Sequence, residues 1–143
     1  MFIDTNALVY SRNLEAPNHY VAKEILERAY QDAEPLRISR QIVREYLAVM
    51  TCPQPWKVQI SRDDVIEDAN RLLRDFEILE DGPVVTDTLI TLCREFEGGG
   101  KQIHDANIVA TMLAHGERRL LTFNTSDFRR YADRIELVGH PSE

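Results

Sequence analysis

The chain has 143 residues, of which 43% are hydrophobic and 29% charged, and its formal net charge is -7 at pH 7. A chain of this length holds one ordinary core and leaves no room for a second. The composition is that of a folded globular protein rather than a disordered one. No apolar run approaches the roughly 18 to 20 residues that cross a bilayer, and no basic region precedes an apolar segment as in a secretory signal. We therefore expect a single cytoplasmic domain over residues 1–143.

The two cysteines and the acidic charge narrow the classes of function. Cys52 and Cys93 form no CxxC or Cys/His spacing, so neither a zinc site nor a disulfide framework is expected. Cys93 falls on a helical apolar stripe and is expected in the core, whereas Cys52 falls in a proline-rich loop. The negative charge argues against nucleic-acid binding, unless some of the acids bind metal ions that cancel their charge.

Hydrophobic periodicity and turn residues predict the elements in chain order. The expected elements are a strand at residues 1–4, a helix at 18–32, a strand at 36–38, a helix from the N-cap Ser39 to residue 50, a helix from the N-cap Ser61 to residue 76 and a strand at 77–79. They continue with a helix that is marked by Leu89, Leu92, Cys93 and Phe96 and stops at the glycines 98–100, a helix at 105–114, a strand at 120–123, a helix at 127–131 and a strand at 135–138. The helix at 105–114 is apolar all round, which predicts a buried central position. Short apolar strands alternating with amphipathic helices predict an α/β fold, with a parallel sheet covered on both faces.

Four acidic residues fall near one edge of this predicted sheet. In an open parallel sheet, ligands bind beyond the carboxyl ends of the strands. Asp4 ends the first strand, and Asp127 follows the strand at 120–123. Asp105 lies in the first turn of the buried helix, and Glu45 lies about 9 Å into a helix that starts at the same edge. We therefore expect these four carboxylates, which are far apart in sequence, to meet at one rim.

Such a cluster is unfavourable by itself, because like charges about 4 Å apart repel by about 1 kcal/mol even in water. Mg²⁺ or Mn²⁺, which prefer oxygen ligands, would neutralise the cluster and could activate a water molecule for attack on a phosphodiester. Each acid also has a structural explanation. Asp4 and Asp127 could cap helices, Asp105 could interact favourably with a helix N-terminus, and Glu45 could be a surface charge.

Four segments carry further information, namely the N-terminal FIDTN, QIVREYLAV, IHDANIVATMLAHG and LLTFNTSDF. Together they resemble the PIN-domain ribonucleases, particularly the VapC-type toxins of toxin–antitoxin pairs. DTN alone is weakly specific, but HDANIVATM followed closely by LLTFNTSDF is strongly so. The segments occur in the family's order and span nearly the whole chain. The resemblance implies a PIN-like three-layer fold, in which a short-stranded parallel sheet lies between helices.

The resemblance also assigns roles to residues. It implies that the acidic metal-binding and catalytic positions are Asp4, Glu45, Asp105 and Asp127. It implies accessory polar roles for Thr5, Asn6, Thr122 and Asn124. The fourth acidic position is ambiguous, because Asn124 and Asp127 could share its role.

The family's chemistry and partners follow from the same resemblance. It implies Mg²⁺- or Mn²⁺-dependent cleavage of single-stranded RNA, which leaves a 5′-phosphate and a 3′-hydroxyl. It also implies a homodimer, and a small antitoxin protein that blocks the acidic site, often through an inserted arginine.

Basic and aromatic side chains could contact the RNA if they line the cleft. The candidates for phosphate contacts are Arg12, Arg40, Arg44, Lys101 and His104. Most arginines and lysines are solvated charges, and a histidine at a helix start is more often structural. Trp56 and Tyr46 could stack on bases, although packing in a core or interface is the more usual role.

Two other functions stay open. A catalytically silent or antitoxin-blocked regulatory module would account for the acidic net charge. A phosphohydrolase of the haloacid dehalogenase type would need a nucleophilic aspartate with a second aspartate two residues later. Asn6 stands at that second position after Asp4, which disfavours this chemistry.

Overall fold

The structure, a computed structural model, describes residues 1–139. Within them, five parallel strands form one sheet in the order β3-β2-β1-β4-β5. The strands are β1 (Phe2–Ile3), β2 (Arg37–Ile38), β3 (Glu77–Ile78), β4 (Arg119–Leu121) and β5 (Glu136–Val138). The helices are α1 (Thr5–Arg12), α2 (His19–Gln31), α3 (Arg40–Met50), α4 (Arg62–Asp75), α5 (Pro83–Glu95), α6 (Lys101–Ala114), α7 (Thr125–Phe128) and the 3-10 helix η1 (Arg129–Tyr131). No helix in this part of the chain is long and apolar enough to span a membrane.

The strand order places the topological switch point of the sheet at β1. β1 pairs with β2 on one side and with β4 on the other, where Ile3 aligns with Leu121. β2 and β3 extend the sheet in one direction, and β4 and β5 extend it in the other. Ligand clefts in open parallel sheets form beyond the carboxyl ends of the strands at such a switch point. The segments that leave β1 and β4, residues 4–6 and 122–124, therefore border one crevice.

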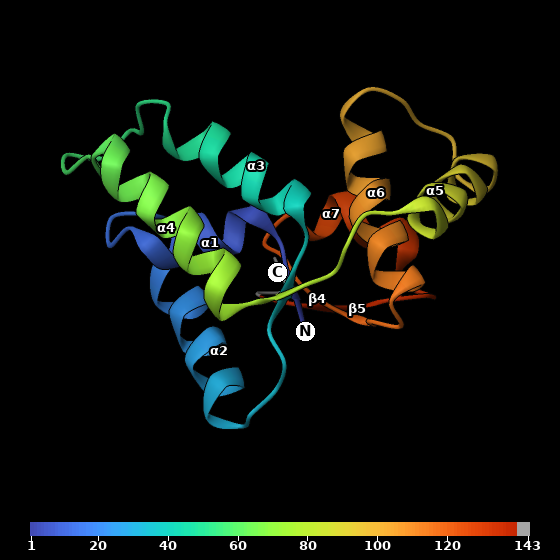
Figure 1. The fold of residues 1–143 in the computed structure, drawn as a ribbon, viewed down its shortest axis with the longest axis horizontal. Coiled ribbons are helices and arrows are strands. Elements are labelled where there is room, and N and C mark those ends of the chain that lie inside the picture. The colour runs from blue at the N-terminus through green and yellow to red at the C-terminus, as the bar shows by residue number, and fades with distance from the viewer. Residues whose placement is uncertain (140–143) are drawn as a thin grey trace.

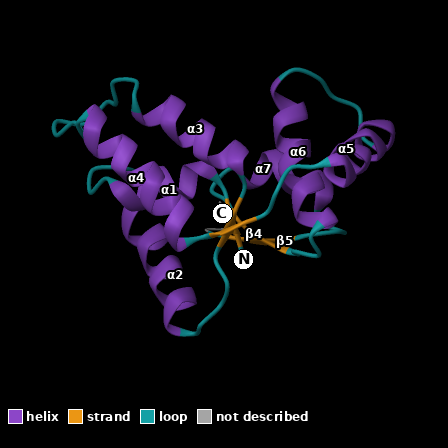
Figure 2. Ribbon diagram, in the orientation of Figure 1, coloured by secondary structure: helices purple, strands orange, loops and turns teal. Residues whose placement is uncertain are grey.

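Helices cover the sheet in two groups. Helices α1 to α4 lie on one side of it, and α5 and α6 lie on the other (Figure 1), with the strands between the two groups (Figure 2). The sheet contributes fully buried side chains to the core, namely Phe2, Ile3, Ile38, Leu120 and Leu121. Helix α6 contributes Ala106, Ile108, Val109, Ala110 and Met112. The predicted α/β fold, with a central parallel sheet and a buried helix near the C-terminal third, is confirmed.

The predicted helix caps differ in how they act. Ser61 caps α4, because its hydroxyl accepts a hydrogen bond from the backbone N–H of Asp64 at 3.1 Å. Ser39 holds the N-cap position of α3, but its side chain makes no capping bond. In residues 1–139 the Ser39 hydroxyl is buried without a hydrogen-bond partner. The side chain of Ser39 therefore does not stabilise the start of α3 as a cap.

The predicted start of α6 was wrong. Helix α6 begins at Lys101 and not at residue 105, because Gly100 adopts a positive φ of 57° that lets the chain turn into the helix earlier. Asp105 consequently lies in the second turn of α6 and not in the first. Helix α5, which the sequence marks by its apolar residues from Leu89 to Phe96, begins at Pro83, since proline suits the first position of a helix.

The prediction that Cys93 lies in the core was also wrong. Cys93 and Cys52 are both exposed and free. Helix α5 buries Val85 and Leu92, and the residue after Leu92 is rotated by about 100° around the helix axis. Cys93 therefore points away from the core face.

Candidate active site

Asp4 connects β1 to α1 and is the most buried of the four candidate acids, with 6% of its surface exposed. It lies just beyond β1 and is the N-cap of α1, where Oδ1 accepts a hydrogen bond from the backbone N–H of Thr5 at 2.8 Å. Its other oxygen, Oδ2, accepts hydrogen bonds from the Thr122 hydroxyl at 2.7 Å and from Asn6 Nδ2 at 3.2 Å. Asp4 thus caps a helix and also lines the cleft described below.

The environment of Asp4 disfavours its charge. The pKa of Asp4 is raised from 3.8 to about 6, mainly by burial, and the nearby carboxylates of Glu45 and Asp105 contribute to this rise. The hydrogen bonds from Thr122 and Thr5 favour the charged form, but they compensate only in part. A carboxylate held in this way gains from a cation placed beside it.

Glu45 projects from α3 and is half-buried. Its Oε2 accepts a hydrogen bond from the Thr5 hydroxyl at 2.7 Å, and its Oε1 accepts one from Gln41 Nε2 at 2.8 Å. These bonds hold both carboxylate oxygens in defined directions. They also connect Glu45 to α1, the helix that Asp4 caps.

Asp105 is half-buried on α6 and faces the other two acids across the cleft. Burial raises its pKa and the nearby charge of Asp127 raises it further, whereas Lys101 and His104 lower it. Asp127 lies inside α7 and is exposed, and the N-cap position of α7 belongs to Asn124. The prediction that Asp127 begins this helix was therefore wrong.

The accessory polar residues link the ends of β1 and β4. Asn6 Oδ1 accepts a hydrogen bond from the backbone N–H of Phe123 at 3.1 Å. The hydroxyl of Thr122 accepts one from the backbone N–H of Asn124 at 3.1 Å, while it donates to Asp4. The side chains of Asn6 and Thr122, with the backbone N–H groups of Thr5 and Asn124, thus form one hydrogen-bonded unit around Asp4.

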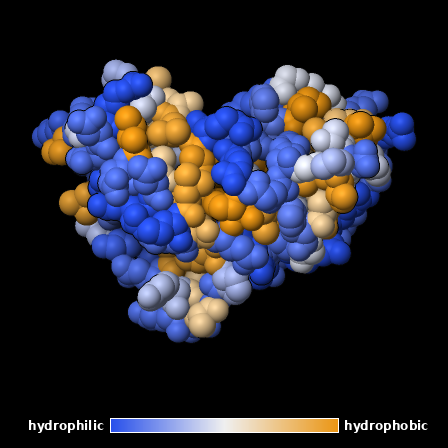
Figure 3. Space-filling model, in the orientation of Figure 1, coloured by the Kyte–Doolittle hydropathy of each residue, from blue (hydrophilic) through white to orange (hydrophobic). Residues whose placement is uncertain are grey.

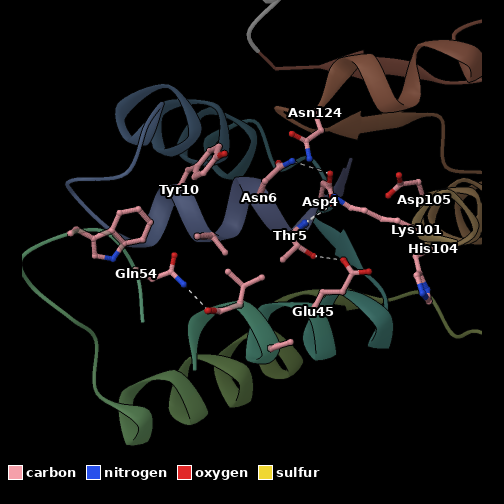
Figure 4. A pocket seen from close by; sticks show the side chains of 14 residues that line it. Asp4, Thr5, Asn6, Tyr10, Glu45, Gln54, Lys101, His104, Asp105 and Asn124 are labelled. Carbon is pink, nitrogen blue, oxygen red and sulfur yellow. Dashed lines mark hydrogen bonds between the residues drawn. The ribbon is translucent and has the colours of Figure 1, made fainter. Parts of the chain in front are cut away.

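A cleft of about 480 Å³ opens beside these residues. It is lined by Asp4, Thr5, Asn6, Val9, Tyr10, Glu45, Ala48, Val49, Gln54, Trp56, Lys101, His104, Asp105 and Asn124. In Figure 4, Asp4 lies between Asn124 and Glu45, with Asp105, Lys101 and His104 on the facing wall. The surface is hollowed between the two groups of helices, and both hydrophilic and hydrophobic residues lie around the hollow (Figure 3). One end of the cleft is therefore acidic, and the other end is apolar and aromatic.

Of the basic candidates, two line the cleft and three do not. Lys101 and His104 line it from α6. Arg12 instead forms an ion pair with the buried Asp68 at 2.8 Å, and Arg40 pairs with Glu80 at 2.6 Å. Exposed Arg44 on α3 does not belong to the cleft lining.

The two aromatic candidates also differ in whether they line the cleft. Trp56 lines the cleft from the loop after α3. Tyr46 is buried, and its hydroxyl donates a hydrogen bond to Asp68 at 2.8 Å. Tyr46 therefore packs in the core, which is the more usual of the two roles considered for it.

The donor chemistry of the cleft fits a hard divalent cation. Three carboxylates border one space, and burial together with mutual repulsion raises the pKa of Asp4 and Asp105. Oxygen ligands of this kind are preferred by Mg²⁺ and Mn²⁺. Within residues 1–139, however, no three His, Cys, Asp or Glu side chains converge closely enough to hold an ion. The acids border the cleft without meeting at one point.

The fold and the cleft define an α/β protein with an acidic site at the switch point of a parallel sheet. The sequence profile of the PIN domain matches residues 1–134. The chain therefore belongs to the PIN domain family, as the sequence resemblance predicted. No curated protein sequence matched it.

Solved structures share the fold at low sequence identity. VapBC2 from Rickettsia felis, bound to a DNA fragment from its promoter, has a TM-score of 0.69 at 20% identity and covers 98% of both chains. VapBC-1 from nontypeable Haemophilus influenzae has a TM-score of 0.67 at 20% identity and covers 96% of both. VapC20 from Mycobacterium tuberculosis, a sarcin-ricin loop cleaving toxin, has a TM-score of 0.66 at 17% identity, covering 90% of this chain and 93% of that one. At sequence identities this low, the similarity to these structures concerns the fold alone.

Sequence reasoning missed two residues that bond to the site. Gln41 contacts Glu45, and Asn107 contacts Gln41 at 2.8 Å. Glu45 follows Gln41 by four residues, which places both on one helix face. That spacing was the available signal for Gln41, whereas nothing in the sequence pairs Asn107 with α3.

Proposed function

We propose that the chain is a divalent-metal-dependent endoribonuclease and the toxin of a toxin–antitoxin pair. The observation that carries the proposal is that Asp4, Glu45 and Asp105, from three separate parts of the chain, line one cleft. Membership of the PIN domain family supports a nuclease. The proposed substrate is single-stranded RNA, and the proposed place of action is the cytoplasm.

The proposed metal ligands are the carboxylates of Asp4, Glu45 and Asp105, with Asp127 or Asn124 supplying a fourth oxygen. When bound, Mg²⁺ or Mn²⁺ would lower the pKa of a coordinated water and stabilise the charge that develops on the phosphate. The chain's own residues hold the acids in place. Thr122 and Thr5 orient Asp4, and Thr5 also directs one oxygen of Glu45.

The proposed substrate contacts are Lys101 and His104, which line the cleft beside Asp105. A cationic side chain at this place attracts a phosphate and reduces the repulsion between the RNA and the acids. The other end of the cleft, at Val9 and Trp56, offers an apolar and aromatic surface beside the acids.

The proposed partner is a small antitoxin protein. The structures that share this fold include VapBC and FitAB toxin–antitoxin complexes. An arginine-bearing segment fits the acidic end of the cleft by charge, since an arginine guanidinium binds carboxylates through paired hydrogen bonds. We further propose that the chain forms a homodimer.

A cleavage assay tests the activity. The antitoxin-free protein should cut single-stranded RNA with Mg²⁺ or Mn²⁺, and a chelator should abolish the cutting. Asp4→Asn and Asp105→Asn should abolish it as well, whereas the matched control Asp87→Asn, an exposed acid on α5, should cut at the wild-type rate. No cleavage by any antitoxin-free preparation would instead favour a silent regulatory module.

A further inference from the structure

The two walls of the cleft are joined by one buried side chain, that of Gln41. Gln41 is the second residue of α3 and has 5% of its surface exposed. Its Nε2 donates hydrogen bonds to Glu45 Oε1 at 2.8 Å and to the backbone oxygen of His104 at 2.9 Å. Its Oε1 accepts a hydrogen bond from Asn107 Nδ2 at 2.8 Å. The side chain thus bonds to its own helix and to two residues of α6.

The partners of Gln41 fix the orientation of its amide. Both partners of Nε2 are oxygen acceptors, so the reversed amide would set oxygen against oxygen. Asn107 donates to Gln41, and its Nδ2 also donates to Asp81 Oδ2 at 3.0 Å. The amide hydrogens and the oxygen of Gln41 are therefore matched in one arrangement, which leaves it little freedom to move.

These bonds span the distance between two of the candidate acids. Glu45 follows Gln41 by one helical turn on α3, and His104 directly precedes Asp105 on α6. Helices α3 and α6 belong to the two groups on opposite sides of the sheet (Figure 1). A shift of α3 relative to α6 would break the bond to His104 and redirect Glu45. The separation of Glu45 and Asp105 thus depends on Gln41.

We propose that Gln41 is a positioning residue, which sets the placement of Glu45 relative to Asp105 and thereby the affinity of the cleft for a divalent cation. The proposal rests on the proposed function in one respect, the binding of a cation by these carboxylates. Hydrogen-bond partners of metal-binding carboxylates typically change metal affinity or activity by about 10- to 100-fold when removed. Gln41 is not among the residues that line the cleft, so it does not act by touching RNA.

The first experiment compares Gln41→Leu with Gln31→Leu. The second variant makes the same chemical change at an exposed position on α2 and serves as the control. Titration calorimetry with Mn²⁺ should show an affinity about tenfold lower or weaker still for Gln41→Leu, and wild-type affinity for Gln31→Leu. In cleavage assays at fixed Mn²⁺, Gln41→Leu should lower kcat and leave the KM for RNA unchanged. Wild-type Mn²⁺ affinity and kcat in Gln41→Leu would overturn the proposal.

The second experiment asks whether Gln41 acts through Glu45. In a Glu45→Gln background, Gln41→Leu should cause little further loss of Mn²⁺ affinity, because residues that act through one another are non-additive. An equal loss in both backgrounds would indicate a general structural effect and overturn the proposal. Asn107→Ala removes one bond to Gln41 and should weaken Mn²⁺ binding in the same direction by less. It replaces Gln41→Leu if thermal unfolding shows that the latter does not fold.

The outcomes separate this inference from the proposed function. If the wild type cuts RNA and Gln41→Leu cuts equally well, the positioning role fails and the nuclease stands. If the wild type binds Mn²⁺ without cutting RNA, and Gln41→Leu weakens that binding, the nuclease fails and the positioning role stands. A wild-type protein that binds no Mn²⁺ would overturn both.

Discussion

The hydroxyl of Thr122 donates a hydrogen bond of 2.7 Å to Asp4 Oδ2, and so connects two residues that are 118 positions apart in the chain. Thr122 follows β4 and Asp4 follows β1, and these strands pair in the centre of the sheet. Thr122 is fully buried, and its backbone N–H donates to the carbonyl of Val138 at 3.0 Å. The direction of the Asp4 carboxylate therefore depends on the pairing of β1, β4 and β5.

The raised pKa of Asp4 predicts how stability varies with pH. The pKa is about 6 in the folded chain against 3.8 without the fold. The folded state therefore binds more protons than the unfolded state between about pH 4 and pH 6, and stability falls as pH rises through that window. Asn keeps the shape and most of the capping ability of Asp without the charge. As the pH rises from 4 to 7, the free energy of unfolding of Asp4→Asn should thus increase by about 2 kcal/mol relative to that of the wild type.

Urea unfolding at several pH values, with chelator present throughout, measures this difference. The gain should appear between about pH 4 and pH 6 and level off above. A difference between Asp4→Asn and the wild type that does not vary with pH would show that the folded-state pKa is not raised.

Divalent cations should stabilise the wild-type fold. An ion that binds only the folded state adds about 2.7 kcal/mol when its concentration is 100 times its Kd, which raises Tm by several degrees in a chain of this size. Asp105→Asn should lose most of this shift, whereas Asp87→Asn should keep it. Thermal unfolding followed by circular dichroism, with and without Mn²⁺, makes the comparison. Equal shifts in all three proteins would place the bound ion elsewhere.

Arg12 and Lys101 should respond differently to substitution. Arg12 pairs with the buried Asp68, so Arg12→Met should lower the free energy of unfolding by about 1 kcal/mol. The loss is this small because the side chain of Arg12 is 40% exposed and solvent screens the ion pair. The substitution should not change the KM for RNA. Lys101 lines the cleft, so Lys101→Met should raise this KM and leave stability unchanged. Denaturant unfolding and cleavage kinetics on both variants test the contrast, and a raised KM in Arg12→Met would mean that RNA reaches beyond the cleft.

Gly139 should not tolerate a side chain. Its φ is 136°, and a Cβ atom there would lie 2.3 Å from the backbone oxygen of Thr122. Gly139→Ala should destabilise the fold by roughly 1–3 kcal/mol and also lower cleavage, because Thr122 orients Asp4. The matched control is Gly82→Ala, where a Cβ has open space and the φ is -117°. Denaturant unfolding and cleavage assays on both variants test this prediction. Equal stabilities and equal cleavage rates for Gly139→Ala and Gly82→Ala would contradict it.

The local sequence pattern was sufficient to predict most of the helices and strands, but not every residue at which a helix begins. The apolar stripes of α3 and α4 and the buried run of α6 follow from spacing alone, since a helix must bury one face. Asp105 was misplaced within its helix because the conformation of Gly100 decides where α6 begins, and a glycine can adopt either sign of φ. Cys93 was misplaced because a position at the edge of an apolar stripe becomes buried only if another element covers it.

The sequence by itself determined the α/β fold, the family and the set of acids that fall near one sheet edge. These properties depend on periodicity and on residues that are close in the chain. Only the tertiary structure decided that Asp127 remains exposed while Asn124 lines the cleft, and that Arg12 pairs with Asp68. It alone brought Gln41 and Asn107 together, 66 positions apart, between the two walls. The reason is physical: which side chains meet depends on how helices pack on both faces of the sheet, and packing joins residues without regard to their distance in sequence.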